Sequence, residues 1–469
     1  MKFREFETDT IAAISTPLGE GGIGVVRLSG PEAIAVADKI FRSKKDRSVE
    51  KQKSFTSQYG HIVERETTNE SFKIIDEVLL LVMRSPGTYT REDMVEISAH
   101  GGSVVLSSIL NLALKKGARL AARGEFTKRA FLNGRLDLLQ AEAVLDLIQA
   151  KTEMTREWAA NQLDGALSKS IKRLKTQLVD ILSHLEASVD FPDDFPETAS
   201  LAKIQNELQA IEKKLAALLA GADTGILMKR GLRVTIAGRP NVGKSSLMNR
   251  LARKDRVIVT PIPGTTRDSV EEEIQIKGFP VRVVDTAGIQ ETSNPIEIEG
   301  IARAKLEVTV SDCVLYVLDA SQPFLKEDAE LLGGLKNKTR LVALNKMDLK
   351  RQIDLAEVEK CAQGASLVPT SCIRDNGTLE LEESLFNLIT AGQLVFGDEP
   401  VLSSVRQKHL VQEALIGIQN ARKTCLDGLS AELVAIDVRL AIDHLGAMVG
   451  EVYTDDVLDV IFDKFCIGK

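Results

Sequence analysis

The stretch GRPNVGKS (residues 238–245) decides the fold of the middle of this chain. It matches the pattern GxxxxGK(S/T), follows the apolar run VTIAG and precedes the helix-like run SSLMNRLAR, which is the context of a P-loop. In such a loop the glycines let backbone N–H groups surround phosphate, Lys244 supplies a positive charge to the β and γ phosphates, and the Ser245 hydroxyl can bind Mg²⁺. The predicted nucleotide contacts are Asn241, Val242, Gly243, Lys244, Ser245 and Ser246.

Three further motifs follow the P-loop in the order expected of a GTP site. DTAG ends the strand-like run VRVVD, where a carboxylate can hold Mg²⁺ through water and a glycine N–H can sense the γ-phosphate. NKMD ends the run LVALN, and its Asp can accept hydrogen bonds from guanine N1–H and N2–H, which adenine does not offer. Ser371 and Cys372 follow LVPT and can support the base from behind. The predicted residues are Asp285, Thr286, Ala287, Gly288, Asn345, Lys346, Met347, Asp348, Ser371 and Cys372.

The segment TPIPGTTRD (residues 260–268) lies between the P-loop helix and the strand-like run SVEEEIQI. A plain loop is one interpretation, but the position favours a nucleotide-sensing switch in which Thr266 completes the Mg²⁺ coordination. The predicted contacts in this switch are Thr260, Pro261, Ile262, Pro263, Gly264, Thr265 and Thr266.

The residue after DTAG is Ile289, where small signalling GTPases have a water-orienting Gln. Another group must therefore position the attacking water. Glu297 and Glu299 are the acidic candidates downstream, and either is alternatively a solvated charge on a helix face.

Composition limits the class of protein. A chain of 469 residues is long enough for roughly three domains of ~150 residues. The net charge of −7 argues against binding nucleic acid through bulk positive charge. The start carries scattered charges unlike a signal peptide, no apolar run approaches the ~18 residues of a membrane span, and five scattered cysteines suggest reduced thiols in the cytoplasm.

The order of strand-like and helical runs along the chain predicts its domain organisation. Short strand-like and helical runs alternate over roughly the first 120 residues, long helices follow from Glu125, strand–loop–helix units return near Gly231, and helices resume after Gly392. This order predicts a helical domain interrupted by an inserted α/β domain. An apolar stripe on one helix is either bundle core or a partner-binding seam, and its residues are Ile204, Leu208, Ile211, Leu215 and Leu218.

The whole chain resembles the MnmE/TrmE-type tRNA modification GTPases. The strings that carry the resemblance are GEGGIGVVRLSG, EDMVEISAHGG, RGEFTKRAFLNGRLDLLQAEAVLDLI, DFPDD, GRPNVGKSS, PGTTRD, DTAGI, NKMD and the terminal FCIGK. It implies a tetrahydrofolate-binding and dimerisation α/β domain (1–122), a helical domain (123–229 and 392–469) and a Ras-like GTPase domain (230–391) inserted in it.

The resemblance also implies an activity and partners. The family acts as a cytoplasmic homodimer and forms a heterotetramer with an FAD- and NADH-using protein of the MnmG/GidA type. Together they add an aminomethyl-type group to C5 of the wobble uridine of certain tRNAs, with a tetrahydrofolate as one-carbon carrier and with K⁺-activated GTP hydrolysis.

Several residue roles rest on the resemblance alone. Arg27, Glu96 and Lys469 correspond to folate contacts, as does Arg135, where other members have Lys. Unaided, Arg27 would be interpreted as a surface charge. Glu297 corresponds to the water-orienting residue. The K⁺ ligands that the resemblance implies are Asn241, Thr260, Ile262 and Thr265.

The terminal thiol Cys466 has several interpretations. The ending CIGK is a poor prenylation site, and the apolar pattern of VLDVIFDKFC favours a buried structural cysteine. The resemblance brings the tail toward the folate pocket, which makes Cys466 a candidate catalytic thiol.

Two other functions compete with this hypothesis. A ribosome-assembly or RNA-binding GTPase of the Era or Der type is disfavoured by the single P-loop and by the lack of a terminal KH-like pattern. A folate-dependent enzyme with a merely regulatory GTPase domain differs only in where the chemistry occurs.

Overall fold

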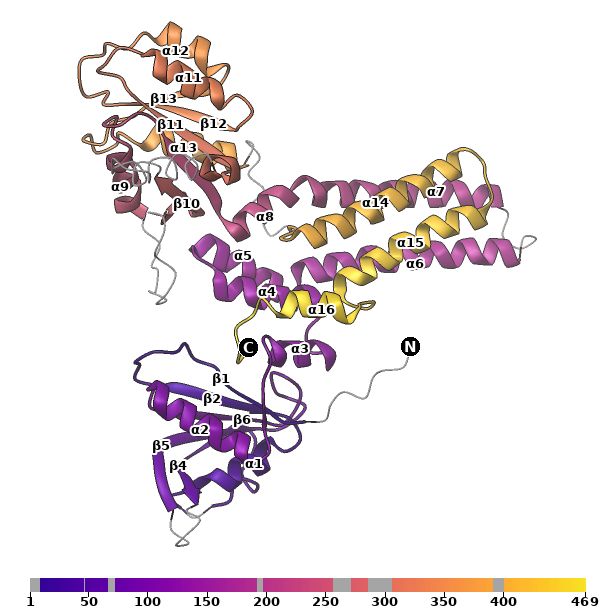
Figure 1. The fold of residues 1–469 in the computed structure, drawn as a ribbon. Coiled ribbons are helices and arrows are strands. Elements are labelled where there is room, and N and C mark those ends of the chain that lie inside the picture. The colour runs from indigo at the N-terminus through magenta and orange to yellow at the C-terminus, as the bar shows by residue number, and fades with distance from the viewer. Residues whose placement is uncertain are drawn as a thin grey trace. The chain divides into compact units, whose positions relative to one another are not determined.

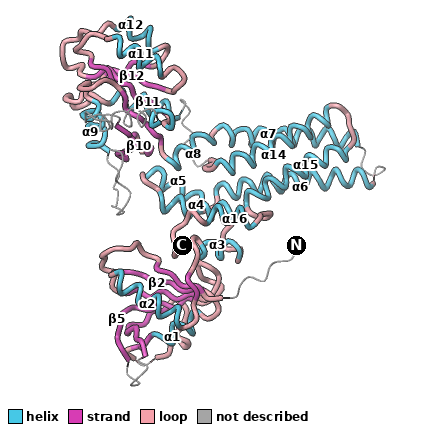
Figure 2. The backbone as a smooth tube through the Cα atoms, viewed as in Figure 1, coloured by secondary structure: helices cyan, strands magenta, loops and turns pink. Residues whose placement is uncertain are grey.

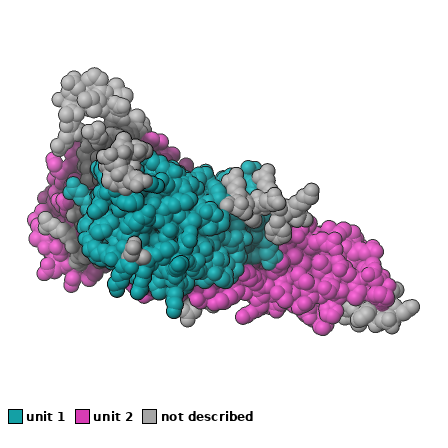
Figure 3. Space-filling model, turned by 90° about the horizontal axis from the view of Figure 1, so that it is seen from below, with its two compact units in different colours: residues 1–145, 446–469 teal, residues 146–445 magenta. Residues whose placement is uncertain are grey.

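The computed structural model describes residues 9–45, 47–65, 72–191, 197–255, 271–285, 306–390 and 400–469, without the side chains of 197–202, 253–255 and 389–390. It divides into two compact units (Figure 3). Unit 1 comprises Met1–Leu145 with Gly446–Lys469, and unit 2 comprises Asp146–Leu445.

Unit 1 is built on a seven-stranded sheet of order β3-β4-β5-β6-β2-β1-β7, in which only the short β1–β7 pairing is parallel. Helices α1 and α2 pack on one face of the sheet (Figure 1). Alternate residues of β2 such as Val26 and Leu28 are buried on this face. The residue between them, Arg27, lies on the opposite face and pairs in register with Glu96 of β6. The elements are β1 Ile11–Ile14, β2 Gly24–Ser29, α1 Ala33–Ile40, β3 Phe41–Ser43, β4 Thr56–Arg65, β5 Phe72–Met83, β6 Met94–Ala99, α2 Ser103–Lys115 and β7 Arg119–Leu120.

The end of the chain returns to unit 1 as a short helix. The elements concerned are α3 Glu125–Leu132, α4 Leu138–Gln149 and α16 Asp455–Phe462. The Thr454 side chain caps α16 by accepting a hydrogen bond from the Val457 N–H. Phe462 and Phe465 pack with Phe131 and Leu138 in one apolar cluster, so the last helix is held by α3 and α4.

Unit 2 contains a bundle of long helices (Figure 2). They are α5 Glu153–Leu163, α6 Ala166–Asp190, α7 Glu197–Ala220, α8 Ala222–Arg230, α14 Val405–Leu426 and α15 Ala431–Val449. Helix α7 packs against α6 and α14. The apolar stripe predicted on this helix is between 0% and 8% exposed, which fits the bundle core rather than a partner-binding seam.

The second part of unit 2 is a six-stranded sheet of order β13-β12-β11-β8-β10-β9, parallel except for β9 at one edge. Alternate residues of β11 face two different apolar clusters, so helices cover both faces of the sheet. The chain leaves β8 for β10 on one side and returns to β11 on the other, which makes the carboxyl end of β8 the switch point of the sheet. The elements are β8 Leu232–Ala237, α9 Lys244–Asp255, β9 Glu271–Ile276, β10 Phe279–Asp285, β11 Cys313–Asp319, α11 Lys326–Gly334, β12 Arg340–Asn345, α12 Leu355–Ala362, β13 Ser366–Pro369 and α13 Leu379–Thr390.

The predicted fold class is confirmed. An N-terminal α/β sheet domain is followed by a helical bundle, and the Ras-like α/β domain interrupts that bundle between α8 and α14. Within the described residues, no helix has the length and apolar character needed to cross a membrane.

Candidate functional site

The P-loop begins at the carboxyl end of β8 and ends at the first turn of α9. Gly238 has a φ of 143°, and a Cβ there would lie 2.4 Å from the Val317 carbonyl oxygen, so only glycine fits. The Lys244 Nζ donates hydrogen bonds to the carbonyl oxygens of Gly238 (2.9 Å) and Arg239 (2.8 Å). Burial lowers the pKa of Lys244, and the Asp285 carboxylate partly offsets this effect. A cation therefore lies beside the N-terminus of α9, an arrangement that attracts phosphate.

Ser245, a predicted Mg²⁺ ligand, lies beside Asp285, which is predicted to hold the ion through water. Because β8 and β10 are parallel neighbours, the start of α9 and the end of β10 meet at the same edge of the sheet. The Ser245 hydroxyl donates a hydrogen bond to Asp285 Oδ2 over 2.7 Å. Hydroxyl and carboxylate oxygens are the donors that Mg²⁺ prefers, so this pair fits the ion.

The NKMD motif donates two hydrogen bonds to the backbone of the P-loop. Asn345 Nδ2 donates to the Val242 carbonyl oxygen over 2.9 Å, and Lys346 Nζ donates to the Asn241 carbonyl oxygen over 3.0 Å. Asn241 and Lys346 both have φ values in the left-handed region, 63° and 61°. Such strained backbone often occurs at functional sites, where surrounding contacts maintain it.

Asp348 is held where it can recognise a base. Its Oδ1 accepts a hydrogen bond of 2.6 Å from the Ser371 hydroxyl, and the Met347 N–H donates to the Thr370 carbonyl oxygen over 3.1 Å. The thiol of Cys372 lies 3.6 Å from Asn345 Oδ1. The carboxyl ends of β12 and β13 thus bring the predicted guanine-binding residues into one group.

One acidic residue of this site was missed in the sequence. Lys346 Nζ also donates to Asp319 Oδ2 over 2.6 Å. Burial tends to raise the pKa of Asp319, but hydrogen bonds from Lys346 and Ser321 outweigh it and hold that pKa below its usual value. Its position at the end of the apolar run CVLYVLD, beside β12 at the same edge of the sheet, was the signal available in the sequence.

Many predicted switch residues lie outside the described residues. They are Thr260, Pro261, Ile262, Pro263, Gly264, Thr265, Thr266, Thr286, Ala287, Gly288, Glu297 and Glu299. Their roles as metal, phosphate and water contacts stay predictions.

A second group of predicted residues meets in unit 1. Arg27 forms an ion pair with Glu96, with Nε and NH2 both 2.8 Å from Oε1. Arg27 NH1 also donates to the Gly468 carbonyl oxygen (3.3 Å), as does the Ser15 hydroxyl (3.1 Å). Gly468 has a φ of 93°, and a Cβ there would lie 2.4 Å from the Ile14 carbonyl oxygen, so glycine is required at this contact.

The other residues of the tail complete this arrangement. The Gly124 N–H donates to the Cys466 carbonyl oxygen over 3.4 Å, and Ile467 bridges to Arg123. Burial and the positive charge of Arg27 lower the pKa of Lys469, while Glu96 and Cys466 act in the opposite direction. The side-chain ammonium group of Lys469 is therefore near the Arg27–Glu96 pair and the thiol of Cys466.

Cys466 differs from the other cysteines. All five are described and free, and Cys466 is the exposed one. Burial raises the pKa of Cys313 to about 12 and also raises the pKa of Cys372 and Cys425. The structure thus contradicts the interpretation of Cys466 as a buried core residue, because the chain leaves the apolar cluster at Phe465.

Arg135 is placed apart from the tail. Its guanidinium lies 4.6 Å from the centre of the Tyr89 ring, and its NH1 donates to the Tyr89 carbonyl oxygen over 3.3 Å. Among the described residues, no contact joins it to Arg27, Glu96 or Lys469.

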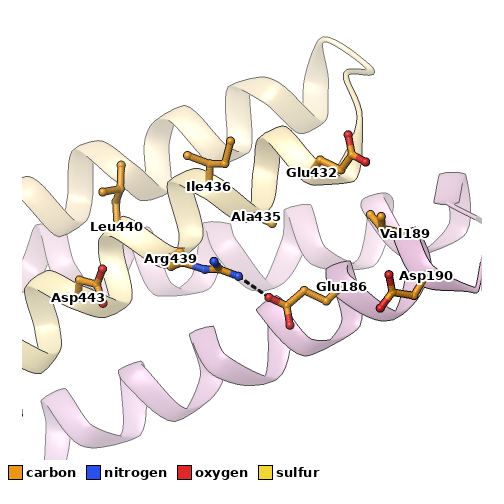
Figure 4. A pocket seen from close by; sticks show the side chains of 9 residues that line it. All are labelled: Glu186, Val189, Asp190, Glu432, Ala435, Ile436, Arg439, Leu440 and Asp443. Carbon is orange, nitrogen blue, oxygen red and sulfur yellow. Dashed lines mark hydrogen bonds and ion pairs between the residues drawn. The ribbon is translucent and has the colours of Figure 1, made fainter. Parts of the chain in front are cut away.

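A groove of about 540 Å³ lies elsewhere in unit 2, between α6 and α15 (Figure 4). An ion pair of 2.6 Å joins Glu186 and Arg439 across it, and Ile436 and Leu440 contribute apolar side chains. No residue of the predicted sites lines this groove.

The fold and the first site define a class of protein. A P-loop at the switch point of a mostly parallel sheet, a facing Ser245–Asp285 pair and a base-recognition carboxylate at the end of β12 are the parts of a Ras-like P-loop GTPase. The chain is a GTP hydrolase of this class.

Comparison with known proteins identifies the family. The family model "MnmE helical domain" matches residues 138–466, and "GTP-binding protein TrmE N-terminus" matches residues 10–135. The chain is 44% identical over 465 residues to tRNA modification GTPase MnmE of Thermoanaerobacter pseudethanolicus, covering 98% of this chain and 99% of that protein. It is 42% identical over 463 residues to MnmE of Bacillus subtilis, covering 98% and 100%. The chain belongs to the MnmE family of tRNA modification GTPases.

A solved structure resembles part of the chain. The G domain of the T. maritima FeoB iron transporter is 29% identical, and the match covers 33% of this chain and 97% of that chain with a TM-score of 0.26. At this TM-score the likeness supports no further argument.

Proposed function

We propose that this chain is a K⁺-activated GTPase that modifies the wobble uridine of certain tRNAs in the cytoplasm. It acts as a homodimer, with an FAD- and NADH-using partner of the MnmG/GidA type in a heterotetramer, and adds an aminomethyl-type group to C5 of the uridine. A tetrahydrofolate derivative carries the one-carbon unit. The observation that carries this proposal is the docking of the tail Cys466–Lys469 on the Arg27–Glu96 pair, in the same chain as a GTP site.

The chemistry of the unit 1 site supports a folate ligand. Reduced folates present N–H donors on the pterin ring and carboxylates on the glutamyl tail. Glu96 can accept from such donors, while Arg27 and Lys469 can bind carboxylate oxygens. The exposed thiol of Cys466 can act as a nucleophile next to them. Arg135, on the same unit, is the proposed fourth contact.

The GTP site supports the proposed ions and the hydrolytic step. Ser245 and Thr266 would bind Mg²⁺, with Asp285 holding it through water, and the ion would neutralise charge at the phosphates. The exposed side chain of Asn241, within the phosphate-binding loop, is a proposed K⁺ ligand, with Thr260, Ile262 and Thr265 as the remaining proposed ligands. Glu297 is proposed to orient the attacking water.

The decisive experiment is analysis of tRNA nucleosides after deletion of the gene. We expect the C5-aminomethyl-type uridine to disappear and to return when the intact chain is supplied from a plasmid. The Lys244→Ala variant, which removes the phosphate-binding cation, serves as a negative control. Unchanged modified uridine in the deletion strain would refute the proposal, and a ribosome-assembly defect in its place would favour an Era- or Der-type role.

The K⁺ dependence is tested separately. We expect GTP hydrolysis to be at least tenfold faster in K⁺ than in Na⁺ at equal ionic strength, because a fitted cation stabilises charge that develops between the β and γ phosphates. Asn241→Ala should abolish this difference, whereas Asn376→Ala, outside the P-loop, should keep it. Equal rates of the intact protein in the two salts would remove Asn241 from its proposed role.

A further inference from the structure

A buried carboxylate on α11 contacts the P-loop from outside the nucleotide-binding motifs. Asp328 is 0% exposed. Its Oδ1 accepts hydrogen bonds from Arg239 Nε (2.8 Å) and the Tyr316 hydroxyl (3.2 Å), and its Oδ2 accepts one from the Leu325 N–H (3.2 Å). Each carboxylate oxygen therefore has a donor, which is what a buried charge requires.

The partner of this carboxylate is the second residue of the P-loop. Arg239 follows Gly238 and precedes Asn241 by two positions. The ion pair is largely buried, with side chains 15% and 1% exposed, and the Asp328 hydrogen bond raises the pKa of Arg239. Loss of one partner from such a pair leaves an uncompensated charge, so the arrangement favours a single position of Arg239.

The remaining contacts of this part of the loop show what Arg239 adds. Gly238 is confined by the Val317 carbonyl oxygen, and the carbonyl oxygens of Asn241 and Val242 accept hydrogen bonds from Lys346 and Asn345. Arg239 lies between these two fixed points, and its carbonyl oxygen accepts the Lys244 hydrogen bond. The ion pair with Asp328 thus adds a side-chain contact at Arg239 to the backbone contact that Lys244 makes there.

We propose that Asp328 is a positioning residue for nucleotide binding. It does not touch the nucleotide; through Arg239 it keeps the backbone from Gly238 to Asn241 in the conformation that binds phosphate. This inference concerns GTP and GDP binding and needs neither the K⁺ site nor the tRNA chemistry. The inference and the proposed function can therefore fail independently of each other.

The test is the dissociation rate of fluorescent mant-GDP from the full-length protein, measured by stopped flow together with the thermal midpoint. We expect Asp328→Asn to release mant-GDP about tenfold faster, because a loop that is competent about a tenth of the time lowers apparent affinity by that factor, and affinity changes among variants of one site lie mostly in the dissociation rate. The value of kcat at saturating GTP should change less than about threefold, since the groups that act on the phosphates stay in place.

A second pair of variants keeps the test valid if Asp328→Asn folds poorly. Arg239→Gln should accelerate the release of mant-GDP as Asp328→Asn does. Arg239→Lys keeps a positive charge opposite Asp328, so its release rate should be close to that of the unmodified protein. The double variant Arg239→Gln with Asp328→Asn should release mant-GDP no faster than either single variant, because both remove the same link.

A matched control separates positioning from stability. Glu307 forms an ion pair of 2.6 Å with Arg233, away from the P-loop, and Arg233 also pairs with Glu271. Glu307→Gln should lower the thermal midpoint and leave the release rate unchanged. The inference would be overturned if Asp328→Asn released mant-GDP at the same rate as Glu307→Gln. It would also be overturned if Arg239→Gln released mant-GDP at the rate of the unmodified protein.

Discussion

We expect Asp348→Asn to lose most of its affinity for GTP and to gain affinity for XTP. The carboxylate can accept both guanine N–H groups, and Ser371 holds it in place. Hydrogen bonds to a charged group contribute about 1.5–3 kcal/mol each, so loss of two lowers GTP affinity roughly 10²- to 10⁴-fold. An amide offers an N–H donor in place of one acceptor, which suits the carbonyl oxygen that xanthine carries at this position.

Binding of mant-labelled GTP and XTP, together with the two hydrolysis rates, measures this exchange of specificity. Asp354→Asn is the matched control, because Asp354 caps α12 by accepting from the Ala356 N–H and Asn caps helices equally well. Unchanged discrimination between GTP and XTP in Asp348→Asn would show that guanine is recognised elsewhere.

The second large effect is expected at Cys466. If its thiol is the nucleophile of the proposed tRNA chemistry, Cys466→Ser should reduce tRNA modification by at least roughly 10³-fold, a loss typical of nucleophile removal. GTP hydrolysis should be unaffected, because the GTP site belongs to unit 2 and the tail to unit 1. Modified uridine in tRNA from complemented deletion cells is the readout.

Cys425→Ser provides the control for this experiment, since Cys425 lies on α14 of the helical bundle and burial raises its pKa. Serine is close to cysteine in size, so the backbone contact between Gly124 and Cys466 is retained in the variant. Normal modification by Cys466→Ser would reduce the thiol to a structural role and leave the folate contacts to be tested on their own.

The GTPase fold and much of its site could be predicted because its chemistry is local in the sequence. Lys244 and Ser245 belong to one motif. Asp285 ends the strand-like run VRVVD, and Asp348 follows the strand-like run LVALN. In a parallel sheet the carboxyl ends of the strands lie at one edge, so such residues meet whatever the details of packing. The structure brings these residues together as that rule predicts.

Contacts that depend on register or on distant packing could not be predicted. Arg27 meets Glu96 only because β2 and β6 pair with those residues opposite each other, and a slip of one residue would place them on different faces. Arg239 and Asp328 are 89 positions apart, and an acidic residue near the start of a helix has an ordinary role in the first turn. The prediction that the C-terminal tail lies near the folate pocket rested on family resemblance alone.

The return of the chain end to β1 and β2 has a consequence for protein synthesis. Arg27 leaves the ribosome 441 residues before the Gly468 carbonyl oxygen that it binds. At about 5–20 residues per second, the first part of this site waits roughly 20 to 90 seconds for its last part. A ribosome that stops early therefore releases a chain whose GTPase domain can be complete while the site in unit 1 lacks its tail.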